Sequence, residues 1–317
     1  HHITLFIPQP VQNFIASKLG TLPMRTIPCL EFEKKDNKII YWKSFINSLR
    51  RLPACISAVL SISRELKTLG IDVVISDFDP ILVYSAKLAG IPVLQLNHPG
   101  IVHKYISMDP RSWFTSLAAR ILEGPATRRI HISFYNGDVG PLIRSTLLEK
   151  PVSDNGTIVI NVKGKARKKL LPILKRLPQY IFDIFPRPNG DFETALASCS
   201  AVITTAGHQT ISEALVLGKP ILAIPQESQF EQILNARMLA KTGRGSFCFM
   251  GMTPKKLPNF LANLERYKKQ SPASAYFCLK NDFKHLLFLI ERSIEHFTNK
   301  KHQICLTEDW EAMQANR

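Results

Sequence analysis

The 317-residue sequence lacks the features of a disulfide-bonded, zinc-binding or membrane-spanning protein. Its six cysteines include no C-x-x-C pair, which argues against a zinc ribbon or a thioredoxin-like site. Six cysteines in a chain of this length are too few for a disulfide framework, so a reducing compartment is the default. No window of about 18 apolar residues predicts a transmembrane helix. We therefore expect a cytoplasmic protein.

Acidic residues are also scarce. The 25 Asp and Glu stand against 41 Lys and Arg, which gives a formal charge of +16 spread over both halves of the chain. Such an excess favours anionic partners: nucleotide phosphates, nucleic acid or an acidic membrane surface. The 45% share of hydrophobic residues excludes a disordered chain, and the length predicts about two domains.

The first half of the sequence alternates between helical and strand patterns. Apolar residues recur at helical spacing over 42–69, and a second helix is expected over 80–89. Residues 71–77 and 91–97 are apolar runs that become polar only at their ends, as central strands of a parallel sheet do. A further strand is expected over 3–7. This order predicts a doubly wound α/β sheet.

The second half repeats the alternation after a turn-rich stretch, 151–156, which we interpret as a linker. Helices are expected over 111–123 and 136–150 before it and over 281–298 near the end of the sequence. Between these, the patterns predict strands over 157–162, 180–185, 200–204 and 220–224, and helices over 165–177, 191–198 and 209–217. We therefore predict two Rossmann-like α/β domains, 1–153 and 154–317.

Residues 201–236 carry the strongest chemical signal. A strand ends at Thr204, Gly207 lets a ligand approach the backbone, and His208 opens a helix. Free N–H groups and the positive end of the helix dipole make that position a phosphate site, to which Thr210 adds a hydroxyl. Glu213 lies one turn further along the helix, and its carboxylate suits the hydroxyls of a ribose.

Two more polar residues follow the next strand. Glu231 and Gln232 are expected at its carboxyl end, where open α/β sheets bind ligands. Carboxylate and amide groups suit sugar hydroxyls because they accept and orient hydrogen bonds.

This stretch resembles the nucleotide-sugar site of GT-B glycosyltransferases, including the bacterial enzyme that adds N-acetylglucosamine to lipid-linked muropeptide and the plant and macrolide UDP-glycosyltransferases. The shared pattern is Ala206-Gly207, Thr210, Glu213-Ala214, Gly218, Pro220, Pro225, Glu231-Gln232 and Asn235-Ala236. The resemblance implies a GT-B fold whose donor site comprises Thr205, Gly207, His208, Thr210, Glu213, Glu231, Gln232 and Asn235. Plant members have a phosphate-binding histidine at the position of Thr205, so that contact is expected to be weaker or moved here. They have an aspartate at the position of Glu231, which leaves the donor sugar open.

Asp77 is the candidate catalytic residue of the first domain. In plant-type members the matching aspartate orients a catalytic histidine, although an aspartate that only caps the next helix is an equal alternative. That histidine belongs to a loop after a first strand that this sequence does not contain, and His2-Ile3-Thr4 resembles the family segment that follows the loop. We therefore expect an N-terminally incomplete chain that binds donor but transfers poorly.

Each residue also has a simpler interpretation. Glu213 fits a solvated helix face, His208 an exposed helix start and Asn235 a polar residue that supports its loop. His98 and His103 follow the strand 91–97 and fit either the cleft or a structural role. A basic cluster fits either a solvated helix face or a patch for a membrane or an acceptor; its members are Lys163, Lys165, Arg167, Lys168, Lys169, Lys175 and Arg176.

The predicted function is transfer of a sugar, with inversion and without a metal or other cofactor, from a UDP-sugar to an acceptor hydroxyl. A lipid-linked acceptor and peripheral contact with an anionic membrane at its inner face are further expectations. Two alternatives stay open: a nucleotide-sugar epimerase of the same fold, and a basic nucleic-acid-binding protein. The sequence shows no aromatic-interleaved basic motif of the RNA-binding kind, so no nucleic-acid partner is expected.

Overall fold

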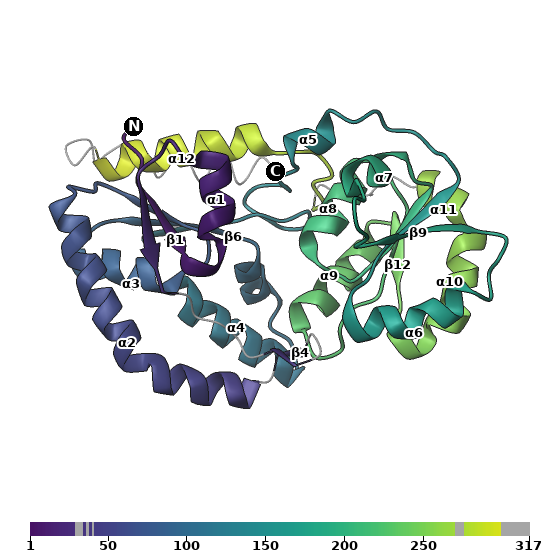
Figure 1. Cartoon of the computed structure of the whole chain (residues 1–317), viewed down its shortest axis with the longest axis horizontal. Coiled ribbons are helices and arrows are strands. Elements are labelled where there is room, and N and C mark those ends of the chain that lie inside the picture. Colours follow the sequence, from purple (N-terminus) through teal and green to yellow (C-terminus); the bar gives the residue numbers. More distant parts are fainter. Residues whose placement is uncertain (29–33, 36–37, 40, 270–275, 299–317) are drawn as a thin grey trace. The chain divides into compact units, whose positions relative to one another are not determined.

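The computed structural model describes residues 1–28, 34–35, 38–39, 41–269 and 276–298, and the chain divides into two compact units (Figure 1). Unit 1 contains residues 1–97, 118–129 and the end of the last helix from Arg292, whereas unit 2 contains 98–117 and 130–291. This division differs from the single boundary predicted between 153 and 154. Residues before that boundary are tied into unit 2, as where the amides of Gly140 and Ile143 bind Asp282 and Asn281.

Unit 1 contains parallel strands with helices packed against them. Its elements are β1 (Leu5–Pro8), α1 (Gln12–Leu19), β2 (Met24–Ile27), β3 (Lys34–Lys35), β4 (Lys38–Ile39), α2 (Tyr41–Thr68), β5 (Val74–Ser76), α3 (Pro80–Ala89) and β6 (Val93–Asn97). Helix α4 (Pro110–Glu123) and strand β7 (Arg128–His131) cross the division between the units. Strands β1 and β2 form one sheet, and β5, β6 and β7 form another in that order.

Helix α3 shows how the local sequence sets the limits of an element. The Asp79 side chain accepts a hydrogen bond from the backbone N–H of Leu82, and Pro80 occupies the first turn, where its missing N–H costs nothing. Gly90 ends the helix at φ 76°, in the left-handed region that glycine adopts without strain. The helix therefore coincides with the predicted range 80–89.

Unit 2 contains one five-stranded parallel sheet. Its elements are α5 (Ser145–Leu148), β8 (Thr157–Asn161), α6 (Gly164–Leu174), β9 (Ile181–Phe185), α7 (Phe192–Ser198), β10 (Ala201–Thr204), α8 (His208–Val216), β11 (Ile221–Ala223), α9 (Phe230–Lys241), β12 (Gly245–Phe247), α10 (Thr253–Ala262), α11 (Leu264–Lys269) and most of α12 (Phe283–Thr298). A 3₁₀ segment, η2 (Pro99–Tyr105), belongs to the same unit.

The strand order of this sheet is β12-β11-β10-β8-β9. Helices α8 and α9 lie on one side of it and α6 and α10 on the other (Figure 1). Strands β8 and β10 are neighbours whose following helices, α6 and α8, lie on opposite faces. Such a switch point opens a crevice at the carboxyl ends of the two strands, which is where doubly wound sheets bind ligands.

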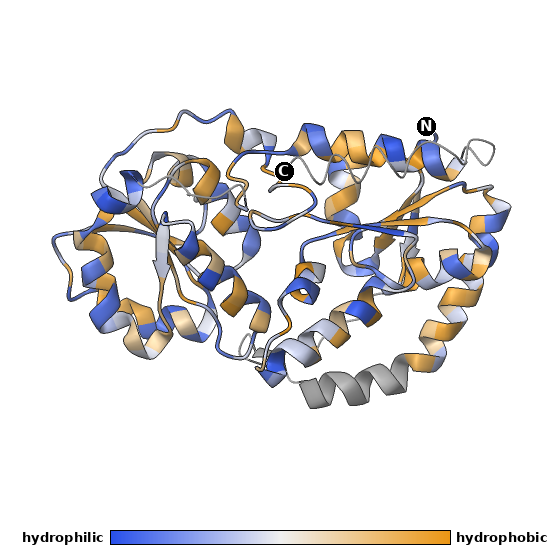
Figure 2. Cartoon of the chain, turned by 180° about the vertical axis from the view of Figure 1, so that it is seen from behind, coloured by the Kyte–Doolittle hydropathy of each residue, from blue (hydrophilic) through white to orange (hydrophobic). Residues whose placement is uncertain are grey.

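The strands at the centre of each unit carry mainly hydrophobic residues (Figure 2). All four residues of β10 are buried, because helices cover both faces of the sheet. The core on one face of this sheet joins strand residues such as Ile160 and Ile203 to Leu170 of α6 and Phe260 of α10.

The helix predicted over 136–150 is mostly absent, and this prediction is wrong. Only α5, four residues long, is helical there. Asn136 lies at φ 45°, and Gly140 and Pro141 interrupt the pattern. The backbone of this segment instead hydrogen-bonds to side chains near α12.

Candidate functional site

The crevice between β8 and β10 is bounded by the residues that end the two strands. The side-chain amide of Asn161, the last residue of β8, donates to the hydroxyl of Thr210 over 3.3 Å. The backbone N–H of Thr205 meets the carbonyl of Asn161 at 3.4 Å. Thr205 and Thr210 are both partly exposed. The structure therefore brings the two predicted threonines to the switch point of the sheet.

The amino-terminal end of α8 is open. Gly207 is its N-cap residue, and no side chain caps the helix by a hydrogen bond. The φ of Gly207 is −72°, which any residue adopts, so the glycine is not needed for a strained turn. A Cβ atom added to Gly207 would meet no heavy atom within 4 Å. The space beside the helix end is therefore free, which suits close approach of an anion to the helix N–H groups.

Glu213 differs from its predicted setting. Its side chain is 1% exposed, so the alternative of a solvated helix face is wrong. Arg144 donates from Nε to Oε1 over 2.8 Å and from Nη2 to Oε2 over 3.0 Å. Gln209 adds a bond to Oε1 at 2.8 Å. Both carboxylate oxygens are therefore occupied, and the Arg144–Glu213 pair is a bidentate ion pair with its carboxylate buried.

Arg144 links this carboxylate to a second one. Its Nη1 lies 2.7 Å from Oε1 of Glu193 on α7, and its own side chain is 45% exposed. The hydrogen bond to Glu213 raises the pKa of the Arg144 guanidinium, with burial acting in the opposite direction. Two carboxylates thus fix one guanidinium beside α8.

A second cluster surrounds the first residue of α8. The rings of His98 and His208 stack with centroids 3.6 Å apart, and His208 also stacks on Phe134. Burial lowers the pKa of His98 and lowers that of His208 well below its usual value. His208 is only partly exposed, so the alternative of a fully exposed helix start is wrong, and His98 joins the site rather than standing apart from it.

Asn235 connects this cluster to the loop before α8. The residue is fully buried, donates from Nδ2 to the carbonyl of Ala206 over 3.2 Å, and accepts from the hydroxyl of Tyr135 over 2.6 Å. This arrangement supports the loop, which is the simpler interpretation of Asn235. His103 lies elsewhere and bonds to Ser116.

Helix α9 presents the two residues predicted to hold the sugar. Glu231 lies in its first turn with the side chain 35% exposed, and its Oε1 is 3.7 Å from Nε2 of His98. Gln232 accepts from the backbone N–H of Gln226 over 3.0 Å and donates to the side chain of Gln229. Glu231 is therefore available to a ligand, whereas the amide of Gln232 fixes the loop before α9.

Asp77 belongs to unit 1, at the carboxyl end of β5. The residue is exposed, and desolvation by neighbouring atoms raises the pKa of its carboxyl group. Asp79, and not Asp77, caps α3. The alternative that Asp77 serves as the helix cap is therefore wrong.

Some residues of the site carried no recognisable signal in the sequence. Arg144, Tyr135 and Asn161 precede the informative stretch by tens of residues, and Gln209 lies inside it but matches no part of the motif. Their contacts with the residues of the motif form only when the chain is folded. Arg144 follows the Gly140-Pro141 turn, and that break in the helical pattern was the one available hint.

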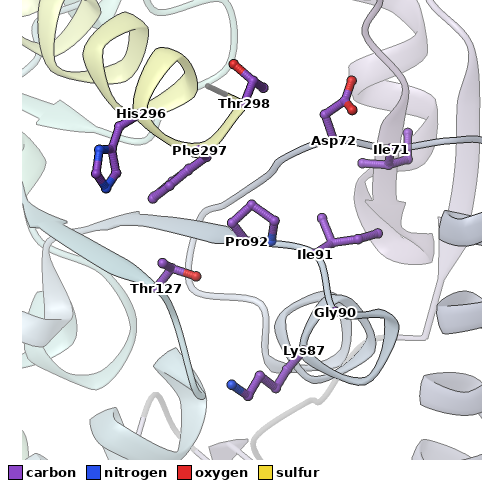
Figure 3. Close-up of a pocket in the computed structure, with 10 residues that line it drawn as sticks. All are labelled: Ile71, Asp72, Lys87, Gly90, Ile91, Pro92, Thr127, His296, Phe297 and Thr298. Atoms are coloured by element: carbon purple, nitrogen blue, oxygen red, sulfur yellow. The ribbon is translucent and has the colours of Figure 1, made fainter. Parts of the chain in front are cut away.

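A separate hollow of about 560 Å³ lies in unit 1, at the amino ends of its strands. Figure 3 shows His296 and Phe297 of α12 across the hollow from Asp72, with Pro92 between them. None of the predicted site residues lines it. Parallel sheets bind ligands at the opposite, carboxyl ends of their strands.

In the part of the chain that the structure describes, no group of three or more His, Cys, Asp or Glu side chains is placed to hold a metal ion. No helix there has the length and hydropathy needed to cross a membrane. The basic cluster lies on and around α6, where most of its side chains are exposed.

Comparison with known proteins supports the resemblance seen in the sequence. Residues 185–265, which contain α8 and α9, match the family model described as "Glycosyl transferase family 1". An "Uncharacterized glycosyltransferase" of Methanosarcina mazei is 27% identical over 149 residues, which are 45% of this chain and 37% of that protein. The chain thus matches little more than a third of the length of that curated relative.

Solved structures give the fold. MurG of Acinetobacter baumannii superposes with a TM-score of 0.57 at 18% identity, covering 88% of both chains. LpCGTa, solved in complex with UDP, gives a TM-score of 0.56 at 15% identity over 94% of this chain and 92% of its own. The predicted fold is confirmed: the chain has the α/β architecture of the GT-B glycosyltransferases.

Proposed function

We propose that this protein is a glycosyltransferase that binds a UDP-sugar in the crevice between β8 and β10. The observation that carries the proposal is the uncapped end of α8 at the switch point of the sheet, inside the segment matching the glycosyl transferase family 1 model. The N–H groups there suit a diphosphate, Thr205 and Thr210 offer hydroxyls beside it, and Glu231 suits a sugar hydroxyl.

Glu213 is the proposed ribose ligand, and its environment defines how it would act. Arg144 and Gln209 fix both carboxylate oxygens, so the group is held in place before a ligand arrives. A carboxylate offers about four accepting lone pairs; Oε1 of Glu213 already accepts from Arg144 and Gln209, so the lone pair left on Oε2 suits a ribose hydroxyl. Prior fixing of this kind lowers the ordering cost of binding.

The proposed reaction is a single displacement. The acceptor hydroxyl oxygen attacks the anomeric carbon, the bond from that carbon to the diphosphate oxygen breaks, and the bonding pair leaves with the diphosphate. The hydroxyl proton passes to a general base, which the resemblance implies is a histidine oriented by Asp77. The N–H groups and dipole of α8 stabilise the charge of the departing diphosphate, so the step as proposed requires no metal.

We further propose a peripheral encounter with an anionic membrane carrying a lipid-linked acceptor. The support is the net charge of +16 and the exposed basic side chains of α6. Attraction of this kind acts over about 8 Å at physiological salt.

Titration calorimetry with UDP tests the donor site. Glu213→Ala removes a charged acceptor of the ribose, and we expect a loss of roughly 1.5–3 kcal/mol, or about 10–150-fold in affinity. Glu193→Gln is the matched control, because Glu193 also pairs with Arg144 but lies outside the motif. Unchanged UDP affinity in Glu213→Ala, with the variant folded, would refute the assignment.

A further inference from the structure

His98 is surrounded by hydrogen-bond acceptors. Its Nδ1 lies 2.9 Å from the carbonyl oxygen of Ile132, and its Nε2 lies 3.2 Å from Oδ1 of Asn235. A carbonyl oxygen only accepts, so Nδ1 must carry a proton. Whether Nε2 also carries one depends on which way the amide of Asn235 points.

The neighbours of Asn235 fix that orientation. Its Nδ2 donates to the carbonyl of Ala206, and its Oδ1 accepts from the hydroxyl of Tyr135. Turning the amide over would place two oxygens, Oδ1 and the carbonyl of Ala206, against each other. Oδ1 therefore faces Nε2 of His98, and only an imidazolium, with both ring nitrogens protonated, satisfies both contacts.

The charged groups around His98 divide into two sets. Glu231 of α9 lies 3.7 Å from Nε2 and favours the cation. His131 of β7 and His208 of α8 oppose it, because each is a like charge when protonated. Tyr135 stays neutral, since burial raises its pKa well above the usual value.

Burial decides the balance in the free protein. Desolvation is the largest influence on His98 and lowers its pKa, while Glu231, the carbonyl of Ile132 and Asn235 raise it by less. The ring is thus neutral near pH 7, inside surroundings arranged for its protonated form. An added negative charge nearby would shift that balance.

The proposed diphosphate site is the place where such a charge arrives. His98 stacks at 3.6 Å on His208, the first residue of α8, whose N–H groups face the uncapped helix end. We propose that nucleoside diphosphate binding at the end of α8 is coupled to uptake of one solvent proton by His98. This inference rests on the proposed function of the same site.

The coupling gives His98 a positioning and charge-compensating role. The proton enters from solvent when the diphosphate binds and returns to solvent when the diphosphate leaves, so the ring shares no bond with the substrate. The imidazolium then adds a positive charge next to α8 at the stage when the leaving diphosphate gains negative charge. It also donates from Nε2 to Oδ1 of Asn235, the contact that the neutral ring, protonated at Nδ1, cannot make.

Titration calorimetry with UDP in two buffers of different ionisation enthalpy, HEPES and Tris, counts the protons. At pH 7.5 we expect net uptake approaching one proton, and an affinity that falls up to about tenfold per pH unit above the resting pKa. His98→Gln should abolish the uptake. His103→Gln, a change in the same segment, should retain it, and uridine, which lacks the diphosphate, should show none.

Glu231→Gln provides a second measurement that does not depend on the stability of the His98 variant. Losing this carboxylate disfavours the imidazolium, so the pH at which uptake is half complete should fall. UDP binding with equal heats in both buffers, after correction for dilution, overturns the inference and leaves the donor site standing. Undiminished uptake in a folded His98→Gln also overturns it, whereas no UDP binding at all overturns both proposals.

Discussion

The ion pair between Arg144 and Glu213 predicts an asymmetric response to mutation. Arg144→Ala leaves the 1% exposed carboxylate of Glu213 with its hydrogen bond from Gln209, whereas Glu213→Gln leaves Arg144 paired to Glu193 and 45% exposed. Water solvates the partly exposed guanidinium of Arg144 much better than the buried carboxylate of Glu213. The arginine variant should therefore be the less stable of the two.

The expected magnitude follows from burial. Removing one partner of a fully buried pair costs about 3–5 kcal/mol. Because water reaches the space that Arg144 vacates, we expect about 2–3 kcal/mol for Arg144→Ala. For a unit of about 150–250 residues this lowers the unfolding midpoint by about 4–12 °C. Glu213→Gln should cost about 1 kcal/mol, the value of an ordinary hydrogen bond.

The double variant Arg144→Ala/Glu213→Gln is the decisive control. It contains no buried charge, so its loss should be smaller than the sum of the two single losses. Thermal unfolding followed by circular dichroism and calorimetry measures all three variants, with the transition of each unit fitted separately. Additive losses, or a glutamate variant less stable than the arginine variant, would refute the reasoning.

Two further predictions concern acid stability and membranes. The hydrogen bond from Lys268, and to a smaller extent the one from Ser200, lowers the pKa of Asp154 to about 2. The carboxylate therefore stabilises the folded state above the unfolded pKa near 4, and that contribution disappears as the pH falls toward 2. The loss of stability in Asp154→Asn, measured by urea unfolding, should shrink between pH 4 and pH 2, and a constant loss would contradict the prediction. The chain should co-sediment with anionic vesicles at low salt and be released by added salt, more readily when Lys165, Lys168 and Lys169 are changed to Gln; binding that ignores salt, or that neutral vesicles reproduce, would count against the membrane proposal.

Sequence reasoning succeeded where the information was local. The range of α3 was predicted because Pro80 and Gly90 act on their own turns of the chain, and the order of strands and helices from β8 to β11 followed from short apolar runs. It failed over 136–150, where helical composition is overruled by contacts with Asn281 and Asp282, more than 130 residues away.

The candidate site shows the same limit. The motif placed Gly207 and Thr210 at the switch point, since a strand, a turn and a helix follow one another there. It did not reveal that Glu213 is bonded to a residue 69 positions earlier, or that His98 is held by Asn235 at a separation of 137. Pairs so distant in the chain become neighbours only through packing, which periodicity does not encode.

The interleaving of the two units has a consequence for how the chain folds as it is made. Ser293 on α12 is fully buried and accepts a hydrogen bond from Arg128, so unit 1 is finished only when residues near the end of the sequence have emerged. At about 5–20 residues per second, the ribosome needs roughly 10–40 s to travel from Asn97 to Arg292. Throughout that interval Arg128 lacks its partner on α12, and the part of unit 1 that the end of α12 completes stays open to chaperones and to other nascent chains.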